Sequence, residues 1–428
     1  MVMQTVMPHD ARADTSAWVD SDFRRLFRAS AVSRFGSEIG ELALPLLAII
    51  TLSARPSQVG LLRAAQFLPF LVATLPLGLI VDRRGKRKLM MRADVGRFVL
   101  VSAMPVSIWL GVGGVGLLCI LVFAAGCLTV LYQLADFAFL PAIVPAHRIV
   151  DANSKLSAVQ SANEIAGKGV GGVVVQVLTA PFAVLFDAVT YLLSAVNLSR
   201  IGTLEDIPRA AGSMSKRSGA GSGLVDVMRH RYIRPLMAEA TTFNFFSEIF
   251  ILALLLHAVR QLGLDAAAIG LVFVGGGIGS FIGAWFGPRL THRFGYGRVL
   301  LATMAVGNTA PVAAILANGD ATTSLAVLVA LFWVMGVGIG IANVHAVSLR
   351  QMMVSDELRG RINAGYRLVS WSVLPLGAMV GGILASAIGA YGAMLVGAFG
   401  IPLATVWVAL SPIPRLTSLT EASDRDML

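Results

Sequence analysis

Ser37-Glu38-Ile39 lies inside a long apolar segment, and the same tripeptide returns 210 residues later as Ser247-Glu248-Ile249, again inside an apolar segment. Further pairs at the same offset are Val59-Gly60-Leu61 with Ile269-Gly270-Leu271, Gly171-Gly172 with Gly381-Gly382, and Asn153 with Asn363. The sequence therefore predicts one unit of six segments written twice. Each copy carries an acid deep in its first apolar segment. Because an ionisable group in hydrocarbon is costly, both acids are candidate functional residues.

The composition places these segments in a membrane. Of the 428 residues, 56% are hydrophobic and only 14% are charged, a balance typical of polytopic membrane proteins. A helix needs about 20 mostly apolar residues to span the bilayer. Twelve such stretches are expected, at residues 26–52, 57–81, 89–110, 114–135, 157–178, 181–199, 235–257, 267–289, 298–317, 323–346, 364–387 and 391–411. We therefore predict an all-α membrane protein with twelve transmembrane helices in two six-helix pseudo-repeats.

The net charge of +10 gathers in the loops on one side of the predicted bundle. The basic residues of that side lie at Arg24, Arg25 and Arg28, at 83–88, at Arg148 and Lys155, at 216–234, at 289–298 and at 350–367. The opposite loops hold little beyond Arg55 and Arg260. Short loops rich in Lys and Arg stay in the cytoplasm, so both termini of this multi-pass protein are expected there. The charge is thus a topology signal, with a secondary attraction to membrane lipid, and does not indicate a nucleic-acid partner.

The expected domains are a cytoplasmic tail at 1–22, a six-helix bundle at 23–200, a cytoplasmic linker at 201–231, a second bundle at 232–411 and a cytoplasmic tail at 412–428. Residues 210–223 are rich in Gly, Ser, Lys and Arg and indicate a flexible linker. Leu224, Val227 and Met228 follow at helical spacing, which fits either a short amphipathic helix on the membrane surface or a plain ordered linker. Because each half holds six segments, the halves are parallel repeats, which place substrate sites between them near the midplane.

The loop between the second and third segments reads Gly78-Leu79-Ile80-Val81-Asp82-Arg83-Arg84-Gly85-Lys86-Arg87-Lys88. It closely resembles the signature loop of the major facilitator superfamily, Gly-x-Leu-Ala-Asp-Arg-x-Gly-Arg-Arg. The stretch from His292 to Arg298 is a degenerate copy at the same offset, as in that superfamily. The resemblance implies the major facilitator fold for the twelve segments.

Further stretches resemble one branch of that superfamily, the bacterial macrolide-efflux and enterobactin-exporter-like group. They are Ala43-Leu44-Pro45-Leu46-Leu47-Ala48, Arg92-Ala93-Asp94-Val95-Gly96-Arg97, Phe186-Asp187-Ala188 and Asp356-Glu357-Leu358-Arg359-Gly360-Arg361. The resemblance covers roughly residues 23–411. It implies efflux of a small organic molecule across the inner membrane, driven by the proton gradient, by a monomer that needs no cofactor and no metal.

The signature loop has the chemistry of a latch. Gly78 and Gly85 allow a tight turn and a close helix approach. Asp82 can accept hydrogen bonds from a helix N-terminus, where negative charge is favoured, and Arg83, Lys86 and Arg87 can pair with acids across the cytoplasmic face. The resemblance implies that this loop joins the two halves when the cavity faces outward. The alternative is that the loop only fixes the topology.

Three acids near the midplane are candidates for proton coupling or for binding a cationic substrate. Burial disfavours the charged form of a carboxylate, so a carboxyl group that alternates between two openings can move a proton. Glu38 and Glu248 are expected on opposite walls of one cavity, and Glu41 shares the face of Glu38 at i+3. Ile251 matches Glu41 in the second copy. The alternative is that these acids are structural and hydrogen-bonded at the interface between the halves.

The fifth segment holds Glu164 and, four residues later, Lys168. Glu before Lys at i, i+4 is a favourable helix pair, and a lysine in hydrocarbon needs such a partner. Lys168 therefore either pairs with Glu164 or lines the path, where it binds an anionic substrate or exchanges partners with Glu38. Two departures from the family pattern stand out. Gly167-Lys168 stands where related antiporters have Gly-Pro. The fourth segment, 114–135, contains no arginine, whereas many drug–proton antiporters have one there that is tied to proton relay.

Other side chains are candidates for the cavity wall and for charge networks. An amphiphilic substrate suits walls of aromatic and amide side chains; the candidates are Gln66, Phe67, Asn244, Phe245, Phe246, Trp333, Asn343 and Trp371. Arg63 and Asp187 lie nearer the outer face, as an external gate or a structural pair. Asp94 with Arg97, and Asp136, are expected in a charge network at the inner face.

These patterns predict an exporter of a hydrophobic or amphiphilic small molecule that works by alternating access in exchange for protons. An importer or symporter on the same fold is the first alternative. A membrane enzyme or scaffold is the second, and it lacks support because the sequence holds no Walker loop, no zinc-binding His-x-x-Glu-His pattern and no nucleophile elbow.

Overall fold

The computed structural model describes residues 16–202, 226–354 and 356–418, and every regular element in these ranges is helical. The first half holds α2 (Ser21–Leu46), α3 (Pro56–Val72), α4 (Thr74–Arg83), α5 (Lys86–Trp109), α6 (Val115–Ile143), α7 (Ile149–Leu178) and α8 (Ala180–Ser199). The second half holds α10 (Ile233–Arg260), α11 (Ala266–Phe294), α12 (Tyr296–Thr309), α13 (Ala321–Met352), α14 (Asp356–Ala387), α15 (Gly389–Gly400) and α16 (Leu403–Ala409). Short turns complete them: η1 (Ala17–Val19), η2 (Leu47–Thr51), η3 (Ala146–Arg148), η4 (Ala310–Leu316) and η5 (Ile413–Arg415).

Twelve spans follow from these helices. Nine are long and apolar enough to cross a membrane, when α3 and α4, bent by 50°, are taken as one span and α15 with α16 (Gly389–Ala409) as another. The other three are α2, α5 and α7, which have the length of a span but carry the charged side chains that lower their hydropathy. These three helices hold Glu38, Asp94 and Lys168 among others. The predicted twelve-helix, two-repeat fold is confirmed.

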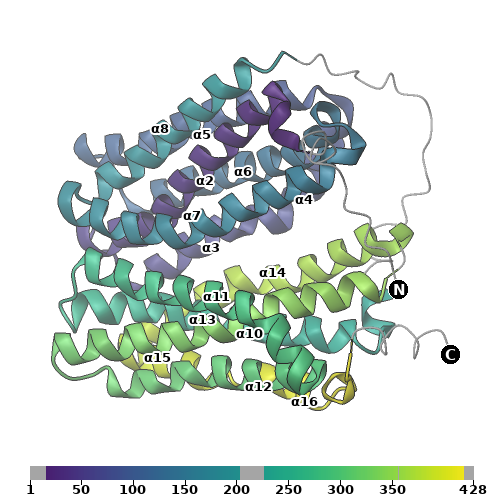
Figure 1. Ribbon diagram of the computed structural model, residues 1–428. Helices are drawn as coiled ribbons and strands as arrows, with labels where there is room; N and C mark the ends of the chain where they lie inside the picture. The colour runs from purple at the N-terminus through teal and green to yellow at the C-terminus, as the bar shows by residue number, and fades with distance from the viewer. Residues whose placement is uncertain (1–15, 203–225, 355, 419–428) are drawn as a thin grey trace.

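The two halves lie side by side, one above the other in Figure 1, and meet along two seams. In one seam α3 packs against α14, and in the other α7 packs against α11. Glycines let the backbones touch there. A Cβ on Gly60 would lie 2.5 Å from the carbonyl oxygen of Ala378 and 3.0 Å from Gly382 Cα. A Cβ on Gly172 would lie 2.5 Å from the carbonyl oxygen of Ala266 and 2.8 Å from Gly270 Cα.

The bundle has two distinct ends. The end of the bundle at which α3 and α11 begin and α7 and α14 end is called the far end. We call the basic end the opposite one, which holds the loops at 83–88 and 289–298 and lies at the right of Figure 1. Both close Gly–Gly contacts lie toward the far end, so the halves are joined there.

Parts of the predicted tails and linker lie outside the described residues, namely 1–15 of the tail at 1–22, 203–225 of the linker at 201–231 and 419–428 of the tail at 412–428. The domain boundaries therefore stay a prediction. Within the described part, residues 226–229 are helical. Val227 is fully buried in the core cluster of the second half that contains Tyr232 and Ile233. This turn therefore presents its apolar side to the protein.

Candidate functional site

Lys168 lies between two carboxylates of α2. Its Nζ is 3.7 Å from Glu38 Oε2 and 3.6 Å from Glu41 Oε1. Gly167 makes this possible, because a Cβ on Gly167 would lie only 2.4 Å from Glu38 Cβ. The glycine thus brings α7 against α2 and places the next residue, Lys168, beside both acids.

The predicted pairing of Lys168 with Glu164 is wrong. Glu164 Oε1 instead accepts a hydrogen bond from Gln160 Nε2 at 3.0 Å, and Arg34 donates to Gln160 Oε1 at 3.0 Å. The other predicted partner, Glu38, is the one that Lys168 contacts. The i, i+4 rule describes one isolated helix, whereas the cation here is attracted by two acids on a neighbouring helix.

Glu248 is held by an arginine of the other half. Arg63 on α3 donates from Nε to Glu248 Oε1 at 2.7 Å and from Nη2 to Oε2 at 3.0 Å. Both side chains are buried, with 6% and 4% of their surfaces exposed. A bidentate pair of this kind is strong and directional, and here it joins α3 to α10 across the interface.

Arg63 does not pair with Asp187, so that predicted pair is wrong. Asp187 lies in the core of the first half, where Tyr191 donates a hydrogen bond to its Oδ2 at 3.3 Å. Gly40 leaves room for this carboxylate, because a Cβ there would lie 2.4 Å from Asp187 Oδ2. No pattern in the sequence indicates the depth of Asp187 inside its own bundle.

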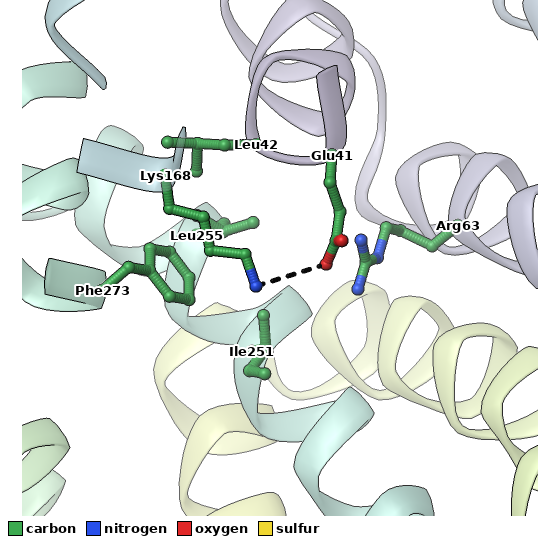
Figure 2. Close-up of a pocket in the computed structure, with 7 residues that line it drawn as sticks. All are labelled: Glu41, Leu42, Arg63, Lys168, Ile251, Leu255 and Phe273. Carbon is green, nitrogen blue, oxygen red and sulfur yellow. Dashed lines mark ion pairs between the residues drawn. The ribbon is translucent and has the colours of Figure 1, made fainter. Parts of the chain in front are cut away.

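A small pocket opens beside Glu41, Lys168 and Arg63, as Figure 2 shows. Its walls are Glu41, Leu42, Arg63, Lys168, Ile251, Leu255 and Phe273, so both halves contribute. Lys168 and Arg63 lie on either side of the Glu41 carboxylate. The cavity volume is about 40 Å³, which suits a few water molecules and is far below the roughly 300 Å³ at which organic-ligand sites begin.

The two repeats pair their equivalent acids with cations at different positions. Glu38 and Glu248 are equivalent at the 210-residue offset, but the position of Arg63 is matched by Phe273 and that of Lys168 by Ala378. Lys168 Nζ lies 5.7 Å from the centre of the Phe273 ring. The cation of Glu38 therefore comes from its own half, whereas the cation of Glu248 comes from the other half.

The site holds more acid than base. Among the described residues, Glu38, Glu41 and Glu248 form ion pairs with only two cations, Lys168 and Arg63. Arg63 and Glu248 match each other and are shut away from solvent, whereas Glu38, Glu41 and Lys168 keep 19%, 38% and 27% of their side-chain surfaces exposed. The excess negative charge therefore lies on the accessible pair, Glu38 and Glu41.

The predicted cavity residues separate into two groups. Gln66 and Phe67 lie beside Arg63, which donates to Gln66 Oε1 at 3.4 Å and lies 4.9 Å from the Phe67 ring centre. Trp371 reaches across the halves to Phe70, with ring centres 5.7 Å apart. The residues of this first group therefore border the interface between the halves.

In the second group, the described contacts of three residues lie within their own half, and two residues are exposed. Asn244 donates to the carbonyl of Ser370 at 2.6 Å. Phe245 and Phe246 contact each other, and Phe246 packs against Gly400. Trp333 and Asn343 are exposed on α13, a helix that packs on α11 and α12. The sequence could not separate these groups, because hydropathy does not report which face of a helix meets the other half.

One described contact ties the predicted latch loop to its own half in this state. Arg87 donates to the carbonyl of Ile201 at the end of α8, and Gly78 has open space where a Cβ would be. Gly85 has a φ of −63°, which any residue adopts. The close helix approach predicted for Gly78 is therefore absent in this conformation, and the backbone of Gly85 needs no glycine, while the predicted close approach at Gly85 stays a prediction. Arg83 and Lys86 lie at the ends of α4 and α5, and the side chain of Asp82 lies outside the described residues.

An aromatic cage in the first half was not predicted. The Arg97 guanidinium lies 4.4 Å from the Tyr132 ring centre and 4.2 Å from that of Tyr191, and it forms an ion pair with Asp94. The pair is almost fully buried in the bundle, not part of a network at the inner face. Asp136 instead pairs with Arg34, whose Nη2 lies 3.9 Å from Asp136 Oδ2 and whose side chain is partly exposed.

Known proteins resemble the whole chain. Residues 15–427 match the family described as "Transmembrane secretion effector". The chain is 23% identical over 386 residues to the uncharacterized MFS-type transporter YfiS of Bacillus subtilis, covering 87% of this chain and 88% of the relative. It is 26% identical over 420 residues to the multidrug efflux pump Tap of Mycobacterium bovis, covering 93% and 95%. The crystal structure of the nucleoside transporter NupG superposes with a TM-score of 0.68 at 13% identity, covering 91% and 98%, which shows a shared fold.

Proposed function

Since the chain belongs to the major facilitator superfamily, in its transmembrane secretion effector family, we propose that it exports amphiphilic organic cations across the cell membrane in exchange for protons. The observation that carries this proposal is that Glu38 and Glu41 share one lysine. Two carboxylates beside one ammonium group leave one negative charge without a partner. In a site of low dielectric, either a proton or a cationic substrate can neutralise that charge.

We place the basic end in the cytoplasm, because short loops rich in Lys and Arg stay on that side. The far end, where the halves are joined, then faces outward, and the structure corresponds to an inward-facing state. The exposed ladder of Arg34, Gln160 and Glu164 supports this orientation. Such polar side chains in the middle of membrane helices need a water-filled opening rather than lipid.

Competition for one negative charge produces exchange. A cationic substrate that enters from the cytoplasm displaces the proton from the Glu38–Glu41 pair. The halves then rock, the Arg63–Glu248 pair separates, and the far end opens. A proton from outside replaces the substrate on the carboxylates, and the neutral site allows the return. The pocket of about 40 Å³ has room only for water in this state, so the substrate requires a conformation in which the halves lie further apart, and there Leu42, Ile251, Leu255 and Phe273 would offer its hydrophobic body an apolar wall.

The direction is tested in inside-out membrane vesicles with an acidic lumen and a fluorescent organic cation such as ethidium. We expect ethidium to accumulate in the lumen, protons to leave it, and an uncoupler to stop both. Accumulation in right-side-out vesicles alone would replace export by import. Accumulation that ignores the pH gradient would reject the coupling.

A further inference from the structure

Among the helices that begin at the far end, α3 and α11 lie in the two seams, and each needs partners for its first N–H groups. The first four N–H groups of a helix have no acceptor within that helix. In α11 the Asp265 side chain accepts from Ala268 at 2.8 Å, and in α3 the Gln58 side chain accepts from Arg55 at 2.8 Å. These local caps leave the N–H groups of Ala266 and Ser57 for other acceptors.

Both N–H groups find their acceptor in the opposite half. Ser57 N donates to Ser386 Oγ at 3.2 Å, and Ser386 lies in the last turn of α14. The same hydroxyl donates to the carbonyl of Gly382 at 2.9 Å. Ala266 N donates to Gln176 Oε1 at 3.2 Å, and Gln176 lies in the last turn of α7. Each half thus caps a helix of its partner half.

The two caps are copies of one another. Gln176 and Ser386 are separated by the 210-residue offset of the repeat, and so are Pro56 and Ala266, the first residues of the two capped helices. Pro56 has no N–H, so the cap in the first half falls on the next residue, Ser57. An amide and a hydroxyl therefore perform the same task at equivalent positions.

The glycine contacts make these caps geometrically possible. Gly382 lies one turn before Ser386 and touches Gly60, while Gly172 lies one turn before Gln176 and touches Gly270. Larger residues would hold the helices apart and carry Gln176 and Ser386 away from the N–H groups. Both caps consequently form only while the far end is closed.

We propose that Gln176 and Ser386 are positioning residues whose reciprocal helix caps bias the protein toward the state with a closed far end. When the halves separate there, Ser57 and Ala266 exchange these acceptors for water. The bias needs neither substrate nor proton, so it goes beyond the proposed function and holds for an exporter and an importer alike. One hydrogen bond of this kind changes the ratio of closed to open states by roughly twofold to tenfold.

The test measures distances across the far end in the purified full-length chain. Cys119 and Cys127 are free and are replaced by alanine, and nitroxide labels are placed at Val112 and Leu316, which are 69% and 66% exposed. Double electron–electron resonance then gives the fractions of short and long distances. We expect Ser386→Ala and Gln176→Ala each to raise the ratio of long to short distances. The double variant should raise that ratio by about the product of the two single factors.

Two further variants separate this role from a general loss of packing. Ser348→Ala is the matched control, because the Ser348 hydroxyl donates at 2.8 Å to Val344 of its own helix, and it should leave the distances unchanged. Ser386→Thr keeps the hydroxyl and should restore the wild-type fractions. An unchanged distance distribution in the Ser386→Ala/Gln176→Ala protein would overturn the proposal, and so would an equal shift in the Ser348→Ala control.

Discussion

At the scale of single residues, one lysine shows what the sequence could and could not predict. Its position in an apolar segment marked Lys168 as unusual, and the same reasoning found Glu38 and Glu248. Its partners could not be predicted with equal success, because they depend on how closely α7 approaches α2 at Gly167. The predicted pair of Arg63 with Asp187 was wrong for a similar reason. Its true acid, Glu248, lies 185 residues away in the other half.

Removal of the charge from either repeated acid should stop coupled transport. Glu38→Gln leaves Lys168 with Glu41 alone and abolishes the excess negative charge. Glu248→Gln leaves Arg63 buried without its carboxylate, a situation that is costly in a closed interface. We expect gradient-driven ethidium efflux to fall at least about tenfold in both variants, which corresponds to roughly 1.4 kcal/mol, while the amount of protein in the membrane stays the same.

Glu164→Gln is the matched control for this prediction. Glu164 lies on the same helix as Lys168, but it bonds to Gln160 and does not share the lysine. It should retain most of the wild-type efflux. Wild-type efflux by both Glu38→Gln and Glu248→Gln would remove these acids from the mechanism.

At the scale of helices, hydropathy predicted the far ends well and the basic ends poorly. The starts of α3 and α11 and the ends of α7 and α14 agree with the expected segments within one residue. At the basic end, however, α6 continues to Ile143 and α7 begins at Ile149, eight residues beyond the limits predicted. The extension of α7 carries polar side chains such as Asp151 and Lys155, which lower its hydropathy. The extension of α6 is mostly apolar and packs into the core cluster of the first half through Phe139, Leu140 and Ile143.

One such extension anchors the start of the chain. Asp151, in the first turn of α7, accepts a hydrogen bond from the N–H of Ala17 at 2.7 Å and pairs with Lys155. Lys155 also lies 5.6 Å from the centre of the Trp18 ring. Hydrogen bonds from Lys155 and from Ala17 lower the pKa of Asp151 below its ordinary value. The anchor is therefore complete above the ordinary aspartate pKa and is lost as the pH falls through the lowered value.

Asp151→Asn should weaken this anchor at neutral pH, because the amide has no charge for Lys155. We expect the backbone amides of η1 to exchange hydrogen faster in mass spectrometry, with a modest effect since the site is exposed. Asp320→Asn, which removes the charge of an N-cap carboxylate at the far end, should leave η1 unchanged. Equal exchange in Asp151→Asn and wild type would show that η1 is held by its apolar contacts alone.

At the scale of the whole molecule, the 210-residue offset predicted the architecture but not the contacts. It identified Gly60 with Gly270 and Gly172 with Gly382 as equivalent residues. The structure shows instead that Gly60 touches Gly382 and Gly172 touches Gly270. A repeat states which residues share a role, and only the arrangement of the two halves decides which residues meet.

Gly60→Val and Gly172→Val should prevent closure of the far end. A side chain at either position meets backbone atoms at 2.5 Å, and backbone cannot move aside as a flexible side chain can. We expect the Val112–Leu316 distance distribution to shift largely to the long component and transport to be lost. Gly116→Val on α6, where nothing lies within 4 Å, should behave as wild type. A short-distance component that persists in both interface variants would contradict this account of the seams.

The reciprocal caps also carry a record of descent. An interface in which residue i of one unit meets residue j of the other, and j meets i, is the pattern of an isologous homodimer. Gln176 with Ala266 and Ser386 with Ser57 still follow it. The far end therefore closes as two copies of one six-helix unit would close against each other. The Arg63–Glu248 bond has no mirror image, because Phe273 stands where a second arginine would be needed, so the twin halves have diverged at this contact.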